Sequence, residues 1–292
     1  IVKKIESRTR AFIEVQNGCN HRCTFCIIPF ARGNSRSVPK LKVLERIRYL
    51  VDQGYKEIVL TGVDLTAWGE DFSKPIKLGN LLQTILKEIP QLPRLRLSSV
   101  DTVELDTEFL DVLKSNTRLM PHLHISAQAG DDMILKRMKR RHLRSNTVEF
   151  CSSIRDIRPD VTFGADLIAG FPTETDEMFK NSLNLIKDCG LTWLHVFPFS
   201  ARNGTPAAKM PRVSAITISQ RAKELRKAGR EQLEEHLTSL QGSVQKVLVE
   251  RNHKGRTENF TQVNYDKYQP IGQIIPTLIT GKGNGVLIGQ PI

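Results

Sequence analysis

The chain has 292 residues, of which 39% are hydrophobic, and a formal net charge of +12. The hydrophobic share is ordinary for a soluble globular protein, and no stretch approaches the roughly 20 uninterrupted apolar residues of a membrane helix, so the sequence predicts no membrane partner. The positive excess favours a polyanionic partner, usually a nucleic acid, over a basic surface that serves only solubility.

Short β-branched runs alternate with helical patterns along most of the chain. The sequence predicts strands over residues 11–15, 57–61, 94–99, 123–127, 162–168 and 192–197, and helices over 41–53, 78–89, 146–157, 175–189 and 214–240. Asn146 and Glu149 are placed as a cap pair for the third helix. This alternation predicts an α/β fold with a parallel sheet and right-handed crossovers. Six such units indicate a partial, open (β/α) barrel of the TIM type, with active residues at the C-terminal strand ends.

The composition changes after the long charged helix. β-branched runs split by glycines over residues 244–250, 273–280 and 285–289 predict a small all-β module. We place the boundary near Leu237, which divides the chain into domains 1–237 and 238–292.

Three of the five cysteines, Cys19, Cys23 and Cys26, form a C-x3-C-x2-C triplet after the first strand. Thiolates this close can hold one four-iron cluster and leave its fourth iron open to a cofactor. A structural zinc site, which lacks a fourth ligand here, and a chance cluster of thiols are the alternatives. Cys151 and Cys189 fit buried helix positions. So few cysteines, and residues 1–6 too short and charged for a signal peptide, predict a reducing, cytoplasmic location.

The triplet, with the aromatic Phe25 before its last cysteine, resembles the signature of radical S-adenosylmethionine (SAM) enzymes. Residues 19–33, which include the triplet, are similar to the methylthiotransferase branch of these enzymes, and so are four further segments, residues 61–65, 128–130, 170–175 and 199–207. The C-terminal module resembles the TRAM domain, a small β-barrel that binds RNA. The resemblance covers nearly the whole chain and keeps the order of the motifs.

The resemblance implies a 4Fe-4S cluster on the three cysteines, with SAM on the open iron. The residues that it assigns to the cofactor are Phe25, Thr61, Gly62, Val63, Asp64, Gln128, Arg140, Asp166 and Ile168. Gly62 lets the backbone approach closely. The alternatives are an ordinary turn for residues 61–64 and plain core packing for Ile168.

Basic residues are frequent in the C-terminal module, where charge can hold phosphate and aromatic rings can stack on bases. The predicted RNA-binding residues are Lys246, Arg251, Lys254, Arg256, Phe260 and Lys267. Phe260 taken alone is more typical of a core.

Methylthiotransferases of this type carry an N-terminal domain whose three further cysteines bind a second 4Fe-4S cluster, the one that delivers sulfur. The sequence contains no such triplet and does not begin with Met. We therefore expect a fragment that cleaves SAM and does not complete methylthiolation by itself.

The resemblance implies transfer of a methylthio group to C2 of N6-threonylcarbamoyladenosine in the tRNA anticodon stem-loop, with a flavodoxin-type electron donor. Residues 27–37 and 61–65 favour this branch over the isopentenyladenosine branch. The positive charge argues modestly against a third branch, which modifies an aspartate of a ribosomal protein. The non-enzymatic alternative is an RNA-binding module with a structural metal.

Overall fold

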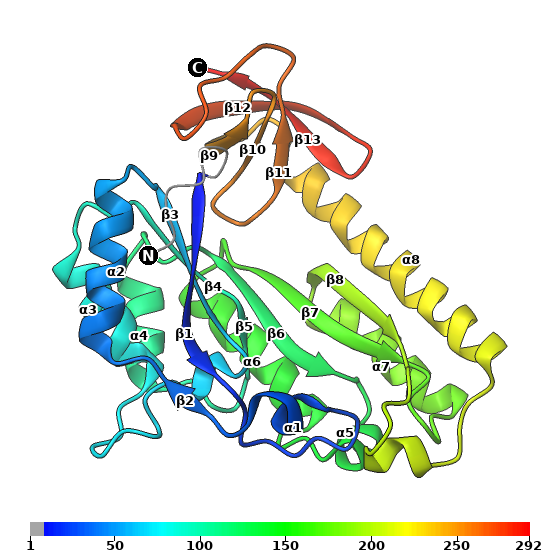
Figure 1. The fold of residues 1–292 in the computed structure, drawn as a ribbon. Coiled ribbons are helices and arrows are strands. Elements are labelled where there is room, and N and C mark those ends of the chain that lie inside the picture. The colour runs from blue at the N-terminus through cyan, green and yellow to red at the C-terminus, as the bar shows by residue number, and fades with distance from the viewer. Residues whose placement is uncertain (1–8) are drawn as a thin grey trace.

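In the computed structural model, which describes residues 9–292, two four-stranded sheets and a closed barrel make up the β structure (Figure 1). Residues 1–6, which are too short and charged for a signal peptide, lie outside the described range. Among residues 9–292, no helix has the length and apolar character needed to cross a membrane.

Apart from the short β2, the strands of the two sheets follow one another in chain order and pair in parallel. The first sheet has the order β2-β1-β3-β4, with β1 at Arg10–Asn17, β2 at Arg36–Ser37, β3 at Glu57–Gly62 and β4 at Arg94–Leu97. The second sheet has the order β5-β6-β7-β8, with β5 at Ser99–Val100, β6 at His122–Gln128, β7 at Thr162–Ala169 and β8 at Leu191–Pro198. Every pairing in them is parallel except that of β2 with β1. The predicted α/β class is confirmed, but the strand expected over 94–99 breaks at Ser98, where one sheet ends and the next begins.

The helices alternate with these strands. The described helices are α1 at Ile28–Arg32, α2 at Lys40–Asp52, α3 at Leu78–Glu88, α4 at Thr107–Ser115, α5 at Asp132–Met138, α6 at Arg144–Ile157, α7 at Asp176–Asp188 and α8 at Ala215–Ser239, with 3-10 turns η1 at Leu65–Ala67 and η2 at Pro206–Lys209. The predicted cap pair of α6 is wrong, because the helix begins before it and the Asn146 side chain accepts a hydrogen bond from the Leu143 backbone N–H. The sequence prediction omitted α4 and α5, whose N-caps are Asp106 and Asp131.

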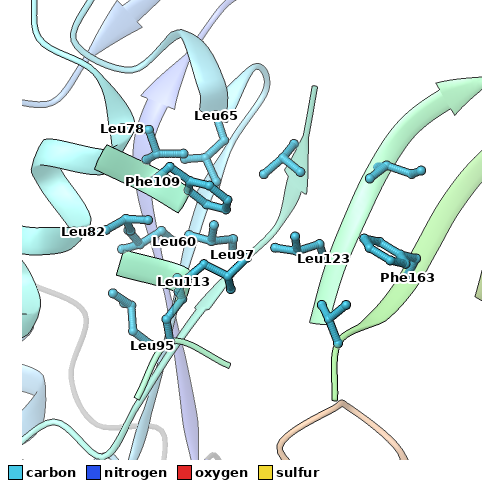
Figure 2. Packing of buried hydrophobic residues seen from close by; sticks show 14 of the residues in the cluster. Leu60, Leu65, Leu78, Leu82, Leu95, Leu97, Phe109, Leu113, Leu123 and Phe163 are labelled. Atoms are coloured by element: carbon cyan, nitrogen blue, oxygen red, sulfur yellow. The ribbon is translucent and has the colours of Figure 1, made fainter. Parts of the chain in front are cut away.

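The main core lies between the sheets and the helices that cover one face of them. Figure 2 shows leucines of β3 and β4 packed against Phe109 and Leu113 of α4 and against Leu78 and Leu82 of α3. Phe109 and Leu82 are fully buried, so truncating either to alanine costs about 2–5 kcal/mol of stability. Cys151 and Cys189 lie buried in the same core, as predicted.

The C-terminal residues form the predicted all-β module, a closed barrel of order β10-β11-β13-β12-β9. Its strands are β9 at Val244–Arg251, β10 at Lys254–Arg256, β11 at Gln262–Asn264, β12 at Ile274–Gly283 and β13 at Val286–Pro291. Leu237, from the last turn of α8, is buried within the barrel's own apolar cluster. The long helix is therefore anchored in the barrel through the residue at which we placed the boundary.

The barrel sits at the amino-terminal ends of the parallel strands, whereas the loop after β1 lies at the opposite ends, near α1 and α5 (Figure 1). At the barrel end, the buried Glu57 carboxylate faces the guanidinium groups of Arg10, Arg94 and Arg96. Arg94 and Arg96 donate in turn to backbone carbonyls of the barrel, at Lys246 (2.8 Å) and Glu258 (3.0 Å). One carboxylate thus orients the cations that bind the two parts together.

Candidate cofactor site

The cysteine loop begins with a turn that only glycine can make. Gly18 follows β1 with φ of +75°, and a Cβ atom there would lie 2.0 Å from the backbone oxygen of Asn34. The turn brings the Cys19 N–H to the Gly33 carbonyl (3.1 Å) at the other end of the loop. The loop is therefore closed at its base, with its three thiols between the two ends.

Backbone hydrogen bonds to distant elements hold the middle of the loop. The Thr24 N–H donates to the Met138 carbonyl at the end of α5 (3.0 Å), and the Thr24 carbonyl accepts from Ala207 in η2 (2.9 Å). The Thr24 hydroxyl also donates to the Arg137 carbonyl (2.7 Å). The loop is thereby tied to α5 and η2.

Gln16 joins the cysteine loop to the turn after β3, and the sequence analysis missed it. Its side chain is fully buried and donates to the Gly18 carbonyl (2.7 Å), while its own oxygen accepts from the Asp64 N–H (2.8 Å). A Cβ atom on Gly62 would lie 2.8 Å from that same oxygen. By strict alternation Gln16 shares the exposed side of Phe12 and Glu14, and a register shift between Glu14 and Gln16 accompanies its burial. The local pattern therefore offered no signal for it.

The three thiols open into a cavity of about 230 Å³ at the C-terminal ends of the strands. The predicted cofactor residues that line it are Phe25, Gly62, Val63, Asp64, Gln128, Arg140 and Asp166. Thr61 and Ile168 are not among its lining residues, and Ile168 packs behind the cavity in an apolar cluster with Phe25 and Phe171. Lining residues outside the predicted set are His21, Ile28, Leu65, Thr66, Ser99, Asp101 and Ser126.

The chemistry of the thiols suits a cluster better than a single ion. All three are free, and burial together with the neighbouring Asp64 carboxylate raises the pKa of Cys19 to about 12. Three thiolates are one ligand fewer than a structural zinc ion takes, whereas they suffice for a four-iron cluster with one iron left open. A bound metal group would also displace the thiol protons.

Charged side chains form two compact groups around the cavity, one around His21 and one around Arg140. His21 lies 3.1 Å from Asp64 and 3.3 Å from Glu104, and the hydrogen bond to Asp64 is the main cause that raises the pKa of His21 to about 9. Arg140 donates to Asp101 (2.8 Å) and lies 3.7 Å from the Cys23 sulfur. The Arg140 Nε is buried and has no hydrogen-bond partner within the described structure. Arg140 lines the cavity, so its guanidinium can attract an anionic ligand there.

Asp166 connects the cavity to two histidines. Its Oδ1 lies 2.9 Å from His124 Nε2 and 3.1 Å from His195 Nδ1. Asp166 and His195 are register partners on β7 and β8, so their side chains share a face of the sheet. Burial of Asp166 opposes its ionisation, but the hydrogen bonds from His124 and His195 outweigh burial and lower the pKa of Asp166.

The residues predicted to bind RNA fall into two groups. Lys246, Arg251, Lys254 and Lys267 are exposed on the barrel, and Arg251 and Lys254 line a groove of about 550 Å³. Phe260 instead packs inside the contact between barrel and sheets, with its ring stacked 5.0 Å from that of His122. The guanidinium of Arg256 lies 4.4 Å from the same ring.

The Phe260 ring and the Arg256 guanidinium thus pack against side chains of the protein itself. We therefore revise the base-stacking role predicted for Phe260 and the RNA contact predicted for Arg256. The guanidinium groups of Arg10 and Arg96 also lie over the Phe260 ring, at 5.1 and 4.8 Å. Tyr268, which is 63% exposed, is an aromatic residue on the barrel surface that the prediction omitted.

Comparison with known proteins agrees with this fold and site. The family model of the radical SAM superfamily matches residues 13–186. Among solved structures, the radical SAM methyltransferase TsrM from Kitasatospora setae has a TM-score of 0.56 at 18% identity, covering 68% of this chain and 38% of its own. Methylornithine synthase PylB has a TM-score of 0.53 at 16% identity, covering 77% of this chain and 64% of its own. The fold and the cysteine loop thus define a radical SAM protein.

Proteins related in sequence indicate which branch of the radical SAM proteins this chain resembles. The threonylcarbamoyladenosine tRNA methylthiotransferase MtaB of Rickettsia prowazekii is 50% identical over 98% of this chain and 68% of its own length. The same enzyme of Bacillus subtilis is 34% identical over 99% of this chain and 66% of its own length. The tRNA-2-methylthio-N(6)-dimethylallyladenosine synthase of Alcanivorax borkumensis is 34% identical over 96% of this chain and 65% of its own length.

The chain belongs to the radical SAM methylthiotransferase family. It spans about two thirds of the length of these curated relatives.

Proposed function

We propose that this chain is the catalytic and RNA-binding part of an enzyme that transfers a methylthio group to C2 of N6-threonylcarbamoyladenosine in the tRNA anticodon stem-loop. The observation that carries the proposal is the 50% identity to a threonylcarbamoyladenosine tRNA methylthiotransferase across 98% of the chain. The dimethylallyladenosine relative at 34% makes that nucleoside the second candidate. A tRNA substrate also implies a cytoplasmic enzyme.

We propose two domains, a radical SAM core over residues 1–237 and a TRAM domain over 238–292. The support for the core is its series of parallel strands with a cysteine loop at their C-terminal ends, which resembles a partial six-stranded barrel of the TIM type. The support for the second domain is its closed five-stranded barrel with exposed lysines.

The chain's own residues have three tasks at the site. Cys19, Cys23 and Cys26 would hold a 4Fe-4S cluster, and the guanidinium of Arg140, which lines the same cavity, is suited to the carboxylate of SAM. Gly62, also in the cavity lining, leaves room for the Gln16 side chain that ties the turn after β3 to the cysteine loop. When bound, the cluster and SAM supply the radical chemistry that removes hydrogen from C2 of the modified adenosine.

Sulfur and electrons must come from elsewhere. Cys151 and Cys189 are buried in the core, so the described residues offer no further thiols for a second cluster. We therefore assign the sulfur-donating 4Fe-4S cluster to residues outside this sequence, and the reducing electron to a flavodoxin-type donor.

Mass spectrometry of tRNA nucleosides tests the proposed function. Cells that lack the full-length gene should lose the 2-methylthio derivative of threonylcarbamoyladenosine and keep that of dimethylallyladenosine. The wild-type gene should restore the lost derivative, whereas a gene carrying Cys23→Ser should not. Loss of the dimethylallyl derivative alone would establish the second candidate instead.

A further inference from the structure

The hydrogen bonds among His124, Asp166 and His195 run in a defined direction, from the two rings to the carboxylate. Because a single carboxylate oxygen faces both rings, each histidine must donate to it, His124 through Nε2 and His195 through Nδ1. His124 is 11% exposed at its side chain, whereas His195 is 62% exposed. With Nδ1 bonded to Asp166, the Nε2 of His195 donates only when the ring is an imidazolium, the form that the adjacent carboxylate stabilises.

The position of His195 ties it to the proposed active site. Asp166 lines the cofactor cavity, and His195 is its register partner on β8. β8 is the last strand of its sheet in the described structure, so a substrate can approach over this edge. His195 also borders a groove of about 250 Å³ between β8 and α8, together with Arg226 and Arg230. The residue therefore lies between a basic groove and the cavity.

The charge of His195 distinguishes it from the other cations near the cavity. The hydrogen bond to Asp166 raises the pKa of His195 above its ordinary value. His21 is already paired with Asp64 and Glu104, and Arg140 with Asp101. His195 shares its one carboxylate with His124, so an anionic ligand at its Nε2 would stabilise the imidazolium further.

We propose that the Nε2–H of His195 receives the carboxylate of the threonylcarbamoyl substituent and so selects this nucleoside over one with an uncharged substituent. The inference rests on the proposed function. A threonine joined through its amine keeps its carboxylate, whereas a dimethylallyl group has no charge to pair. Asp166 acts as a positioning residue, because its hydrogen bond to Nδ1 fixes the ring and stabilises the imidazolium that carries the Nε2–H. The same N–H could hold a backbone phosphate, and the experiment separates these two anions.

Binding of synthetic anticodon stem-loops tests the proposal by fluorescence anisotropy. Three RNAs are compared, one with threonylcarbamoyladenosine, one with its methyl ester and one with unmodified adenosine. The wild-type chain should bind the acid about tenfold more tightly than the ester, which corresponds to about 1.4 kcal/mol. His195→Gln should remove that difference by weakening only the acid.

His253→Gln is the matched control, since it removes an exposed histidine from the groove on the barrel. It should leave the acid-to-ester ratio unchanged. Thermal unfolding of His195→Gln should match that of the wild type because the side chain is exposed.

Three results would overturn the inference alone. Equal weakening of all three RNAs by His195→Gln would assign the residue to a phosphate, and no weakening would remove it from recognition altogether. Stoichiometric zinc that His195→Gln abolishes would make the group a metal site. A fourth result, no binding of any of the RNAs to the wild type, would overturn the proposed function as well, so the two failures are distinguishable.

Discussion

The two ends of the same parallel strands carry opposite arrangements of charge. At the amino-terminal ends, Glu57 is fully buried among the guanidinium groups of Arg10, Arg94 and Arg96, and the barrel covers the group. At the carboxyl-terminal ends, three free thiols and Arg140 line a cavity. Buried polar atoms without a partner occur at both ends, because the Arg96 Nη1 and both ring nitrogens of His122 also lack one in the described structure. The cavity with its thiols, more than unpaired polar atoms, therefore marks the ligand site.

The largest effect is expected from the thiols. After anaerobic reconstitution with iron and sulfide, the wild-type chain should absorb near about 400 nm, and Cys23→Ala should lose this band because only two ligands remain. Cys151→Ala, which removes a thiol buried in the core, should keep it. Ultraviolet–visible spectra and iron content measure the outcome. A colourless wild type that binds zinc would favour an RNA-binding module with a structural metal.

The second effect concerns the opposite end of the strands. Glu57→Gln leaves three buried guanidinium groups without their carboxylate and should lower the free energy of unfolding by about 3–5 kcal/mol. Glu88→Gln breaks the exposed pair with Arg48 and should change the free energy by less than about 1 kcal/mol. Urea denaturation compares the two variants. Similar values for both would show that the buried group contributes no special stability.

Acid should reproduce the Glu57 effect without a mutation. Burial opposes ionisation of Glu57, but the attraction of Arg96 and Arg10 outweighs it and lowers the pKa from 4.5 to about 2. A carboxyl whose pKa is lower in the folded state contributes stability that is complete above the unfolded pKa and is lost as pH falls toward the folded pKa. The difference in unfolding free energy between wild type and Glu57→Gln should therefore shrink between about pH 4.5 and pH 2. A difference independent of pH would contradict this.

The smallest effect is expected on the exposed face of the barrel. Lys254→Ala removes one cation from the groove that also contains Arg251, so RNA binding should weaken and the slope of log K against log salt should fall by about 1. Phe260→Ala should instead lower stability, because its ring lies between His122 and Arg256. A larger loss of salt dependence in Phe260→Ala than in Lys254→Ala would reverse the two roles.

Local patterns in the sequence predicted the alternation of strands and helices, the all-β module and the cysteine loop, because each depends on neighbouring residues. Contacts between distant segments were not predictable in this way. Gln16 meets Asp64 across 48 positions, and Arg140 meets Asp101 across 39. In the sequence, Phe260 is an aromatic residue among basic ones, a pattern that fits an RNA-binding face and a contact between domains equally. Only the folded structure shows that Phe260 lies in the contact between the barrel and the sheets.

A cluster held by Cys19, Cys23 and Cys26 should keep one iron open to SAM. Electron paramagnetic resonance of the reduced, reconstituted chain detects this site when spectra are recorded before and after addition of SAM. We expect a signal from a 4Fe-4S cluster whose g values shift when SAM binds, and a smaller shift in Arg140→Gln at the same SAM concentration. A signal that SAM leaves unchanged, or a sample with zinc in place of iron, would contradict it.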